Sequence, residues 1–384
     1  MIYLDNQATT ACDPRVLDAM WPWFSAQPGN PHSTEHAIGR RAADAVEAAR
    51  AEIAALIGAS PGEILFTSGA TEANNLAIKG AARFAGSRER RRIITAATEH
   101  KCVLESARDL AAEGFEPLIL PVAPSGAIDH ADLGLALQTP TLLVSFMAAN
   151  NETGFLHDLG ALGRAAHAAG ARVHSDLAQA AGKLSLDVTG LGLDAASLSA
   201  HKLYGPKGIG ALYVRRRPRM RIAPLFSGGG QERGARSGTV PTPLAVGFGE
   251  ACRIARLELA AEATRIAALR DRLLRGLDAR IPGLALNGPP APRLAGNLSL
   301  RFPGVRALDL IAACPELAIS TGSACTSADI APSHVLTALG LTAGAAAASL
   351  RLGIGRFNSA ADIDAAIDML SAAYARLAPA RAEA

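Results

Sequence analysis

Cysteine is scarce in this sequence of 384 residues, and its five copies are scattered along the chain. None of them forms a Cys-x-x-Cys pair, so the sequence favours neither a zinc ribbon nor a disulfide framework. The first residues lack a basic segment followed by an apolar one, and we therefore expect no secretory signal. The expected location is a reducing compartment, the cytoplasm.

Long hydrophobic runs and a strong excess of one charge are also missing. No apolar run reaches the roughly 20 residues of a membrane-spanning helix, and the formal net charge is only +3. Such a charge argues neither for nor against a nucleic-acid partner. The dinucleotide motif Gly-x-Gly-x-x-Gly and the P-loop motif are both absent. We expect no nucleic acid and no membrane among the partners.

What the sequence does contain is a regular alternation of apolar, β-branched segments with helical patterns. This rhythm predicts an α/β fold with a mostly parallel sheet that is covered by helices on both faces. The predicted strands are 63–68, 91–97, 141–147, 171–176, 196–200 and 208–216, and the predicted helices between them are 69–84, 101–114 and 159–170.

The pattern changes beyond Pro243. A long amphipathic helix is predicted over 244–277. It is followed by two predicted strands, at 297–302 and 349–355, and by two predicted helices, at 307–314 and 361–377. This order favours a second, smaller α+β domain, and two domains suit the length of the chain. The predicted large domain covers 15–250, and the small domain covers 1–14 and 251–384.

An aspartate and a lysine stand at the ends of two predicted strands, in "VHSDLAQ" and "SAHKLYGPKGIG". Asp176 ends one strand and Lys202 follows the other, so both side chains can face one pocket. Pyridoxal phosphate (PLP) requires such a pair, because a lysine forms the Schiff base and an aspartate keeps the ring nitrogen protonated. Taken alone, either residue could instead be an ordinary capping or surface group.

A phosphate site is predicted close by. The segment "TSGATEANN" ends a strand and opens a helix, so that the backbone N–H groups of Ala70 and Thr71 form an anion site. Ser199 and His201, which flank Lys202, add further donors. The alternative for the helix start is an ordinary side-chain cap.

Several longer motifs occur in one order, among them "YLDNQATT", "EILFTSGATEANNLAI", "TEHKCVL", "NNETG", "GGGQERGARSGT" and "STGSACTSAD". With them the chain resembles the cysteine desulfurases of the iron–sulfur assembly and nitrogen-fixation type, which are class V, fold-type I PLP enzymes. The resemblance implies an aspartate-aminotransferase-like large domain with a mostly parallel seven-stranded sheet. It also implies removal of sulfur from L-cysteine, which leaves L-alanine.

The resemblance further implies the catalytic residues. Lys202 matches the Schiff-base lysine, and His100 matches the histidine that stacks on the PLP ring. Cys325 lies in a segment rich in Ser, Thr, Gly and Ala, and it matches the nucleophile that receives the sulfur as a persulfide. Arg351 matches the arginine that binds the substrate carboxylate, with Arg356 as a close rival.

Other residues match cofactor contacts. Gln179 corresponds to the residue that bonds the phenolic oxygen of PLP, and Asn151 lies near that oxygen and the substrate carboxylate. Thr239 corresponds to a residue that reaches the phosphate of the neighbouring subunit, which implies a homodimer. The implied cofactor contacts in full are Ala70, Thr71, His100, Asn151, Asp176, Gln179, Ser199, His201, Lys202 and Thr239.

The implied partners are L-cysteine and a sulfur-acceptor protein, either an iron–sulfur scaffold or a thiolation carrier. Three alternatives keep the fold: a selenocysteine lyase, a class V aminotransferase and a non-enzymatic accessory subunit. A remote alternative is a zinc peptidase, because His32, Glu35 and His36 fit the motif His-x-x-Glu-His. We expect no bound metal.

Overall fold

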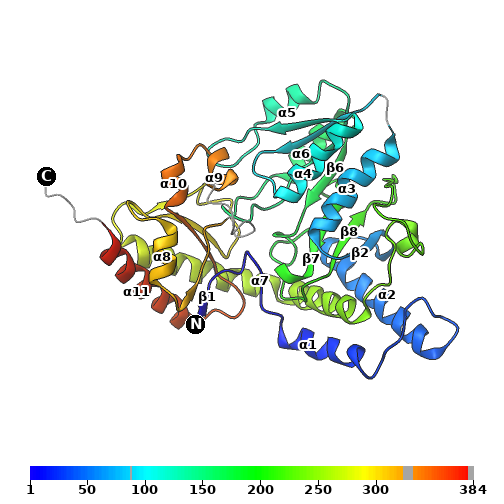
Figure 1. Cartoon of the computed structure of the whole chain (residues 1–384), viewed down its shortest axis with the longest axis horizontal. Helices are drawn as coiled ribbons and strands as arrows, with labels where there is room; N and C mark the ends of the chain where they lie inside the picture. The colour runs from blue at the N-terminus through cyan, green and yellow to red at the C-terminus, as the bar shows by residue number, and fades with distance from the viewer. Residues whose placement is uncertain (87–88, 323–331, 379–384) are drawn as a thin grey trace.

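A seven-stranded sheet forms the centre of the computed structural model, which describes residues 1–86, 89–322 and 332–378 (Figure 1). The strand order is β2-β8-β7-β6-β5-β3-β4, and every neighbouring pair is parallel except those that β8 makes. The predicted mostly parallel, seven-stranded sheet is therefore confirmed. The strands are β2 (Ile64–Thr67), β3 (Arg92–Ala96), β4 (Glu116–Leu120), β5 (Thr141–Ser145), β6 (Arg172–Asp176), β7 (Ala195–Ser199) and β8 (Gly210–Val214).

Strand β4 is the one member of the sheet that the sequence analysis did not identify. Its sequence "EPLIL" begins with an exposed glutamate and a proline, which are unusual in buried strands. The strand lies at the edge of the sheet, where it pairs only with β3. An edge position tolerates both residues, because one side of the strand needs no ladder hydrogen bonds.

Successive residues of the strands point to opposite faces of the sheet, and each face has its own hydrophobic core. One core holds Leu65, Ile93 and Leu143 under helices α3 (Ala70–Ala85) and α4 (Lys101–Asp109). The other holds their neighbours Phe66, Ile94 and Val144. The helices that contribute to this second core include α2 (Ala37–Ile57), α5 (His130–Ala136), α6 (Leu159–Ala168) and the first half of α7 (Thr242–Asp278).

A separate core organises the C-terminal part of the chain. It joins the second half of α7 to an antiparallel sheet, of order β12-β10-β9, and to the last helix. The N-terminal strand β1 pairs with β11 there, far in sequence from its neighbours in space (Figure 1). The elements are β1 (Ile2–Tyr3), β9 (Ala285–Leu286), β10 (Asn297–Arg301), α8 (Ala307–Ala313), β11 (Leu317–Ala318), α9 (His334–Ala338), α10 (Ala343–Ala347), β12 (Ser349–Gly353) and α11 (Ala360–Leu377).

Helix α7 is continuous across the predicted domain boundary at 250/251. Its buried residues belong to the first core as far as Ala255 and to the C-terminal core from Ile266 onward. The division into 15–250 and 1–14 with 251–384 stays a prediction. The N-terminal segment leaves the C-terminal core after Leu4, and helix α1 (Pro14–Met20) packs on the first core through Val16 and Met20.

None of the helices in the described ranges combines the length and the apolar character that crossing a membrane requires.

Candidate active site

A cavity of about 550 Å³ opens at the carboxyl ends of the parallel strands. In open α/β sheets this edge is where ligands bind, because the loops that follow the strands converge there. Ten of the twelve residues singled out from the sequence line this one cavity. They are Ala70, Thr71, His100, Asn151, Asp176, Gln179, Ser199, His201, Lys202 and Arg351.

The start of helix α3 forms one end of the cavity. Gly69 is the N-cap residue, and no side chain caps this helix end, so the alternative of an ordinary Ser or Thr cap is wrong. Ala70 and Thr71, whose N–H groups lie in the uncapped first turn of this helix, line the cavity. Gly210 packs so closely here that a Cβ atom on it would lie 2.6 Å from the Gly69 Cα.

His201 lies at the same end of the cavity. Its Nδ1 atom is 3.0 Å from the Thr9 hydroxyl oxygen. Burial, with the nearby ammonium groups of Lys202 and Lys207 adding to it, lowers the pKa of His201 to about 4. The imidazole is therefore neutral at pH 7, and it can donate one hydrogen bond to an anion without adding a charge.

Asp176 and Lys202 face the middle of the cavity from neighbouring strands. The Asp176 carboxylate accepts hydrogen bonds from the Asn74 amide at 2.7 Å and from the Ala178 N–H at 2.8 Å. The Lys202 amine donates to the backbone carbonyls of Gln7 and Ala8, both at 2.7 Å. Asn74 and Gln7 were missed in the sequence analysis, although both belong to the motifs quoted there.

His100 is the N-cap residue of α4. Its Nδ1 atom accepts the backbone N–H of Cys102 at 3.2 Å, so the proton of the neutral ring resides on Nε2. The Cys102 sulfur lies 3.0 Å from the same Nδ1 atom and accepts from the Asn74 amide at 3.1 Å. Cys102, for which the sequence analysis proposed no function, thus lines the cavity.

Arg351 and Arg356 occupy different surroundings. Arg351 lines the cavity and is 3% exposed, and its guanidinium donates to Asp5 at 2.8 Å and to the Gly322 carbonyl at 3.2 Å. Its Nε atom is buried without a hydrogen-bond partner among the described residues. An anion in the cavity could accept from that atom.

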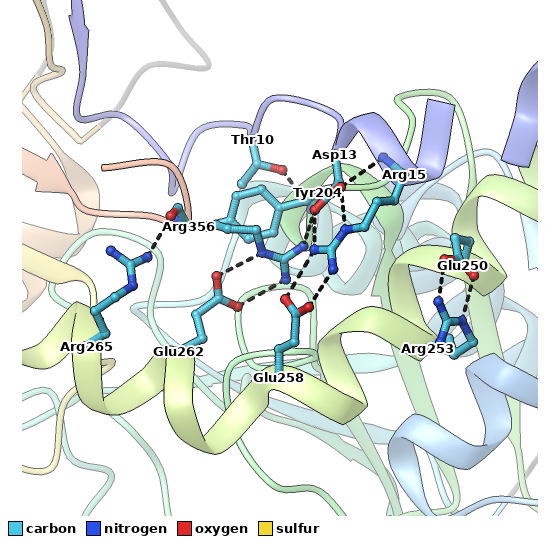
Figure 2. A network of polar contacts seen from close by, with 10 residues as sticks. All are labelled: Thr10, Asp13, Arg15, Tyr204, Glu250, Arg253, Glu258, Glu262, Arg265 and Arg356. Atoms are coloured by element: carbon cyan, nitrogen blue, oxygen red, sulfur yellow. Dashed lines mark hydrogen bonds and ion pairs between the residues drawn. The ribbon is translucent and has the colours of Figure 1, made fainter. Parts of the chain in front are cut away.

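Arg356 belongs instead to a buried network of ion pairs (Figure 2). It donates to Asp13 at 2.8 Å and to Glu262 at 2.9 Å, and it lies 4.2 Å from the centre of the Tyr204 ring. The hydrogen bonds from Arg15 and Arg356 hold the pKa of Asp13 well below its usual range. This geometry favours Arg351 over its rival as the arginine that meets a substrate.

Two predicted residues are not part of the described cavity. Thr239 is exposed and does not line it. The segment that precedes Thr239 is anchored by Glu232, whose carboxylate pairs with Arg50 at 2.7 Å in the protein interior. Cys325 lies outside the described residues, and Gly322, the last described residue before it, lines the cavity.

The zinc-peptidase alternative is wrong on geometry. Both histidines of its motif belong on one helix, a turn apart. Here His32, Glu35 and His36 precede α2, which begins at Ala37, and the His36 Nδ1 atom caps that helix by accepting from Gly39 at 3.0 Å. In residues 1–86, 89–322 and 332–378, no group of His, Cys, Asp and Glu is arranged to hold a metal ion.

Comparisons with known proteins show the family to which this chain belongs. The family model for class-V aminotransferases matches residues 2–366. Cysteine desulfurase IscS of Rickettsia akari is 50% identical over 369 residues, which cover 96% of this chain and 90% of that protein. The cysteine desulfurase of Homo sapiens is 50% identical over 367 residues, covering 96% and 80%. A solved NifS-like protein matches with a TM-score of 0.91 and 36% identity over 98% of this chain and 100% of its own. The chain therefore belongs to the class-V aminotransferase family and, within it, to the cysteine desulfurases.

Proposed function

We propose that this cysteine desulfurase binds PLP through Lys202 and uses Cys325 to take the sulfur of free L-cysteine. The observation that carries the proposal is that ten residues, matched to family roles from the sequence alone, line one cavity. Dependence on PLP follows from membership of the family. The roles of the individual residues are the proposed part.

The groups that line the cavity fit PLP at three points. The N–H groups at the start of α3, with His201 and Ser199, suit the phosphate. The Asp176 carboxylate suits a protonated ring nitrogen, and the Lys202 amine suits the aldehyde. When bound, PLP withdraws electrons from the α-carbon of the substrate and thereby weakens the bonds around it.

Different side chains of the protein then transfer the proton, bind the substrate and take the sulfur. The Lys202 Nζ atom takes the proton from the substrate α-carbon, and the Arg351 guanidinium holds the substrate carboxylate. The Cys325 thiolate attacks the substrate sulfur, so that a sulfur–sulfur bond forms while the carbon–sulfur bond breaks. The electron pair of the broken bond takes up a proton at the β-carbon, and the Lys202 Nζ atom returns a proton to the α-carbon to complete L-alanine. Cys325 retains the sulfur as a persulfide.

The product implies a protein that accepts sulfur from Cys325, and we propose an iron–sulfur scaffold or a thiolation carrier in the cytoplasm. We also propose a homodimer, in which the exposed Thr239 reaches the phosphate site of the neighbouring subunit. A monomeric mass in sedimentation equilibrium would contradict the dimer. Efficient sulfur transfer to neither kind of acceptor would contradict the choice of partner.

The test measures absorbance, sulfide and alanine after L-cysteine and a thiol reductant are added to the PLP-loaded protein. We expect sulfide and alanine in equal yield. Cys325→Ala should keep the absorbance of bound PLP and lose sulfide release, whereas Lys202→Ala should lose the absorbance of the lysine-bound cofactor. Cys12→Ala is the matched control, because Cys12 is a partly buried thiol that does not line the cavity.

Three outcomes would contradict parts of the proposal. Undiminished sulfide release by Cys325→Ala would exclude that residue as the sulfur acceptor. Transfer of the amino group to a keto acid, without sulfide, would favour a class V aminotransferase. Turnover of selenocysteine alone would favour a selenocysteine lyase.

A further inference from the structure

A second lysine lies directly behind the cavity, and the mechanism above does not use it. Lys183 lies four residues after Gln179 in a segment of turns, and its amine donates a hydrogen bond to the Gln179 side-chain oxygen at 2.9 Å. Lys183 does not line the cavity itself. It lines a separate hollow of about 40 Å³ that Gln7, Tyr204 and Glu262 also line.

The surroundings of this amine are unfavourable for a charge. Burial, with the positive charges of Lys202 and Arg351 adding to it, lowers the pKa of Lys183 to about 7, and the carboxylate of Glu262 acts in the opposite direction. Placing a cation here costs free energy that a methionine of the same length would not. Such costs are common where an ionisable group serves a function.

The hydrogen bonds around Gln179 fix which way its amide points. The Lys183 amine has N–H bonds to donate in both its charged and its neutral form, and it donates to the side-chain oxygen. A backbone carbonyl only accepts, and the Gln7 carbonyl meets the side-chain nitrogen of Gln179 at 2.8 Å. Both contacts therefore select the same orientation of the amide.

This orientation leaves one N–H bond of the Gln179 side chain for a ligand. The amide nitrogen carries two hydrogens, and the Gln7 carbonyl takes one of them. Gln179 lines the cavity, and the Lys202 amine donates to the same Gln7 carbonyl at 2.7 Å. Lys183 is thus connected to Lys202 through the Gln179 side-chain amide and the Gln7 carbonyl.

We propose that Lys183 is a positioning residue, which holds the Gln179 amide so that its second N–H faces the ring oxygen of bound PLP. The inference rests on the proposed function, since that function places PLP beside Gln179. A donor at this oxygen stabilises its anionic form and so lowers the pH at which the bound cofactor loses its proton.

The test reads the visible absorbance of the PLP-loaded protein as a function of pH. In Lys183→Met we expect the apparent pKa of the bound cofactor to rise by about one unit, the size of one lost hydrogen bond to a charged group. Lys183→Arg keeps a donor and a charge, and it should return most of that shift. In a Gln179→Leu background, Lys183→Met should cause no further shift.

Lys79→Met is the matched control. It removes the same charge from α3, where Lys79 pairs with Asp109 at 2.7 Å and does not line the cavity. We expect no change in the absorbance titration. The unfolding temperature of each variant without PLP shows whether a change in fold accompanies a shift, and Lys183→Gln replaces Lys183→Met if that variant does not fold.

Two results would overturn the inference. An equal shift in the presence and absence of the Gln179 side chain would show that Lys183 does not act through that amide. An unchanged titration, with a lower unfolding temperature, would assign Lys183 a purely structural role. Failure of the proposed function looks different, because the wild-type protein itself would then show no bound PLP or release no sulfide.

Discussion

Arg351 and Arg356 show that a residue's role depends on what its side chain touches. Both arginines occur in the segment "SLRLGIGR". Arg351 belongs to strand β12, and its side chain reaches the cavity. Arg356 follows the strand and is held by two carboxylates (Figure 2). A guanidinium that two carboxylates already bind has few donors left for a substrate.

We predict that Arg351→Lys raises the KM for L-cysteine about tenfold, with a smaller change in kcat. Lysine keeps the charge beside Asp5 but loses the fork of parallel N–H groups that matches a carboxylate. Steady-state kinetics over a range of L-cysteine concentrations measures the effect. An unchanged KM would contradict the assigned role.

Arg356→Met serves as the comparison for that experiment. Its removal leaves Asp13 and Glu262 buried without this partner, which should lower the free energy of unfolding by about 3 kcal/mol. Urea unfolding measures this loss. A rise in KM larger than that of Arg351→Lys would reverse the assignment of the two arginines.

At the scale of elements, strand β8 positions the start of α3, where we propose that the phosphate of PLP binds. Gly210 begins β8, and a Cβ atom there would lie 2.4 Å from the Leu198 carbonyl oxygen and 2.6 Å from the Gly69 Cα. Both neighbours are backbone atoms, so they cannot turn away as a side chain would. The close approach of β8 therefore needs glycine.

We predict that Gly210→Ala weakens PLP binding at least about tenfold, a free-energy change of roughly 1.4 kcal/mol. The added methyl group displaces Gly69, and with it the N–H groups at the start of α3. Fluorescence titration of the protein with PLP gives the Kd. Gly344→Ala is the control, since among the described residues no atom outside its own stretch of helix lies within 4 Å of the added carbon. An equal loss in both variants would contradict the explanation.

At the scale of the whole molecule, the N-terminal segment joins the C-terminal core to the cavity. Leu4 is buried in that core. The next residues supply a carboxylate to Arg351, from Asp5, and two carbonyls to Lys202, from Gln7 and Ala8. Asp13 then binds Arg356 before α1 begins. The site is therefore complete only when the N-terminal segment lies between the two cores.

Acid should destabilise the folded chain partly through His174. This imidazole is buried between Ser145 and Ser197, and burial lowers its pKa to about 3. In the unfolded chain its pKa returns to about 6.5. Between pH 7 and pH 5 only the unfolded chain takes up the proton, so the free energy of unfolding falls by about 2 kcal/mol from this group.

We predict that His174→Gln lacks this part of the acid response. The difference in the free energy of unfolding between wild type and variant, from urea titrations, should shrink by about 2 kcal/mol from pH 7 to pH 5. Burial raises the pKa of Glu99, which changes stability with the opposite sign, but both chains contain Glu99. A difference that stays constant with pH would contradict the prediction.

Local hydrophobic periodicity and short motifs were sufficient to predict much of the main sheet and part of the candidate site. Six of the seven strands of the main sheet, the helix that starts at Ala70 and the pair Asp176 and Lys202 follow from periodicity and motif spacing. These features depend on residues that are close in sequence, and hydrophobic periodicity records which of their faces is buried. The resemblance to a family supplied the remaining roles.

The tertiary structure decided which distant groups meet. Lys183 meets Gln179 within one local turn, and only the packing of that turn against the N-terminal segment joins the pair to Gln7 and Lys202. The same holds for the contact between Cys102 and Asn74 and for the choice between the two arginines. Such contacts depend on strand order and on where long connections return, and local hydrophobic periodicity does not encode either.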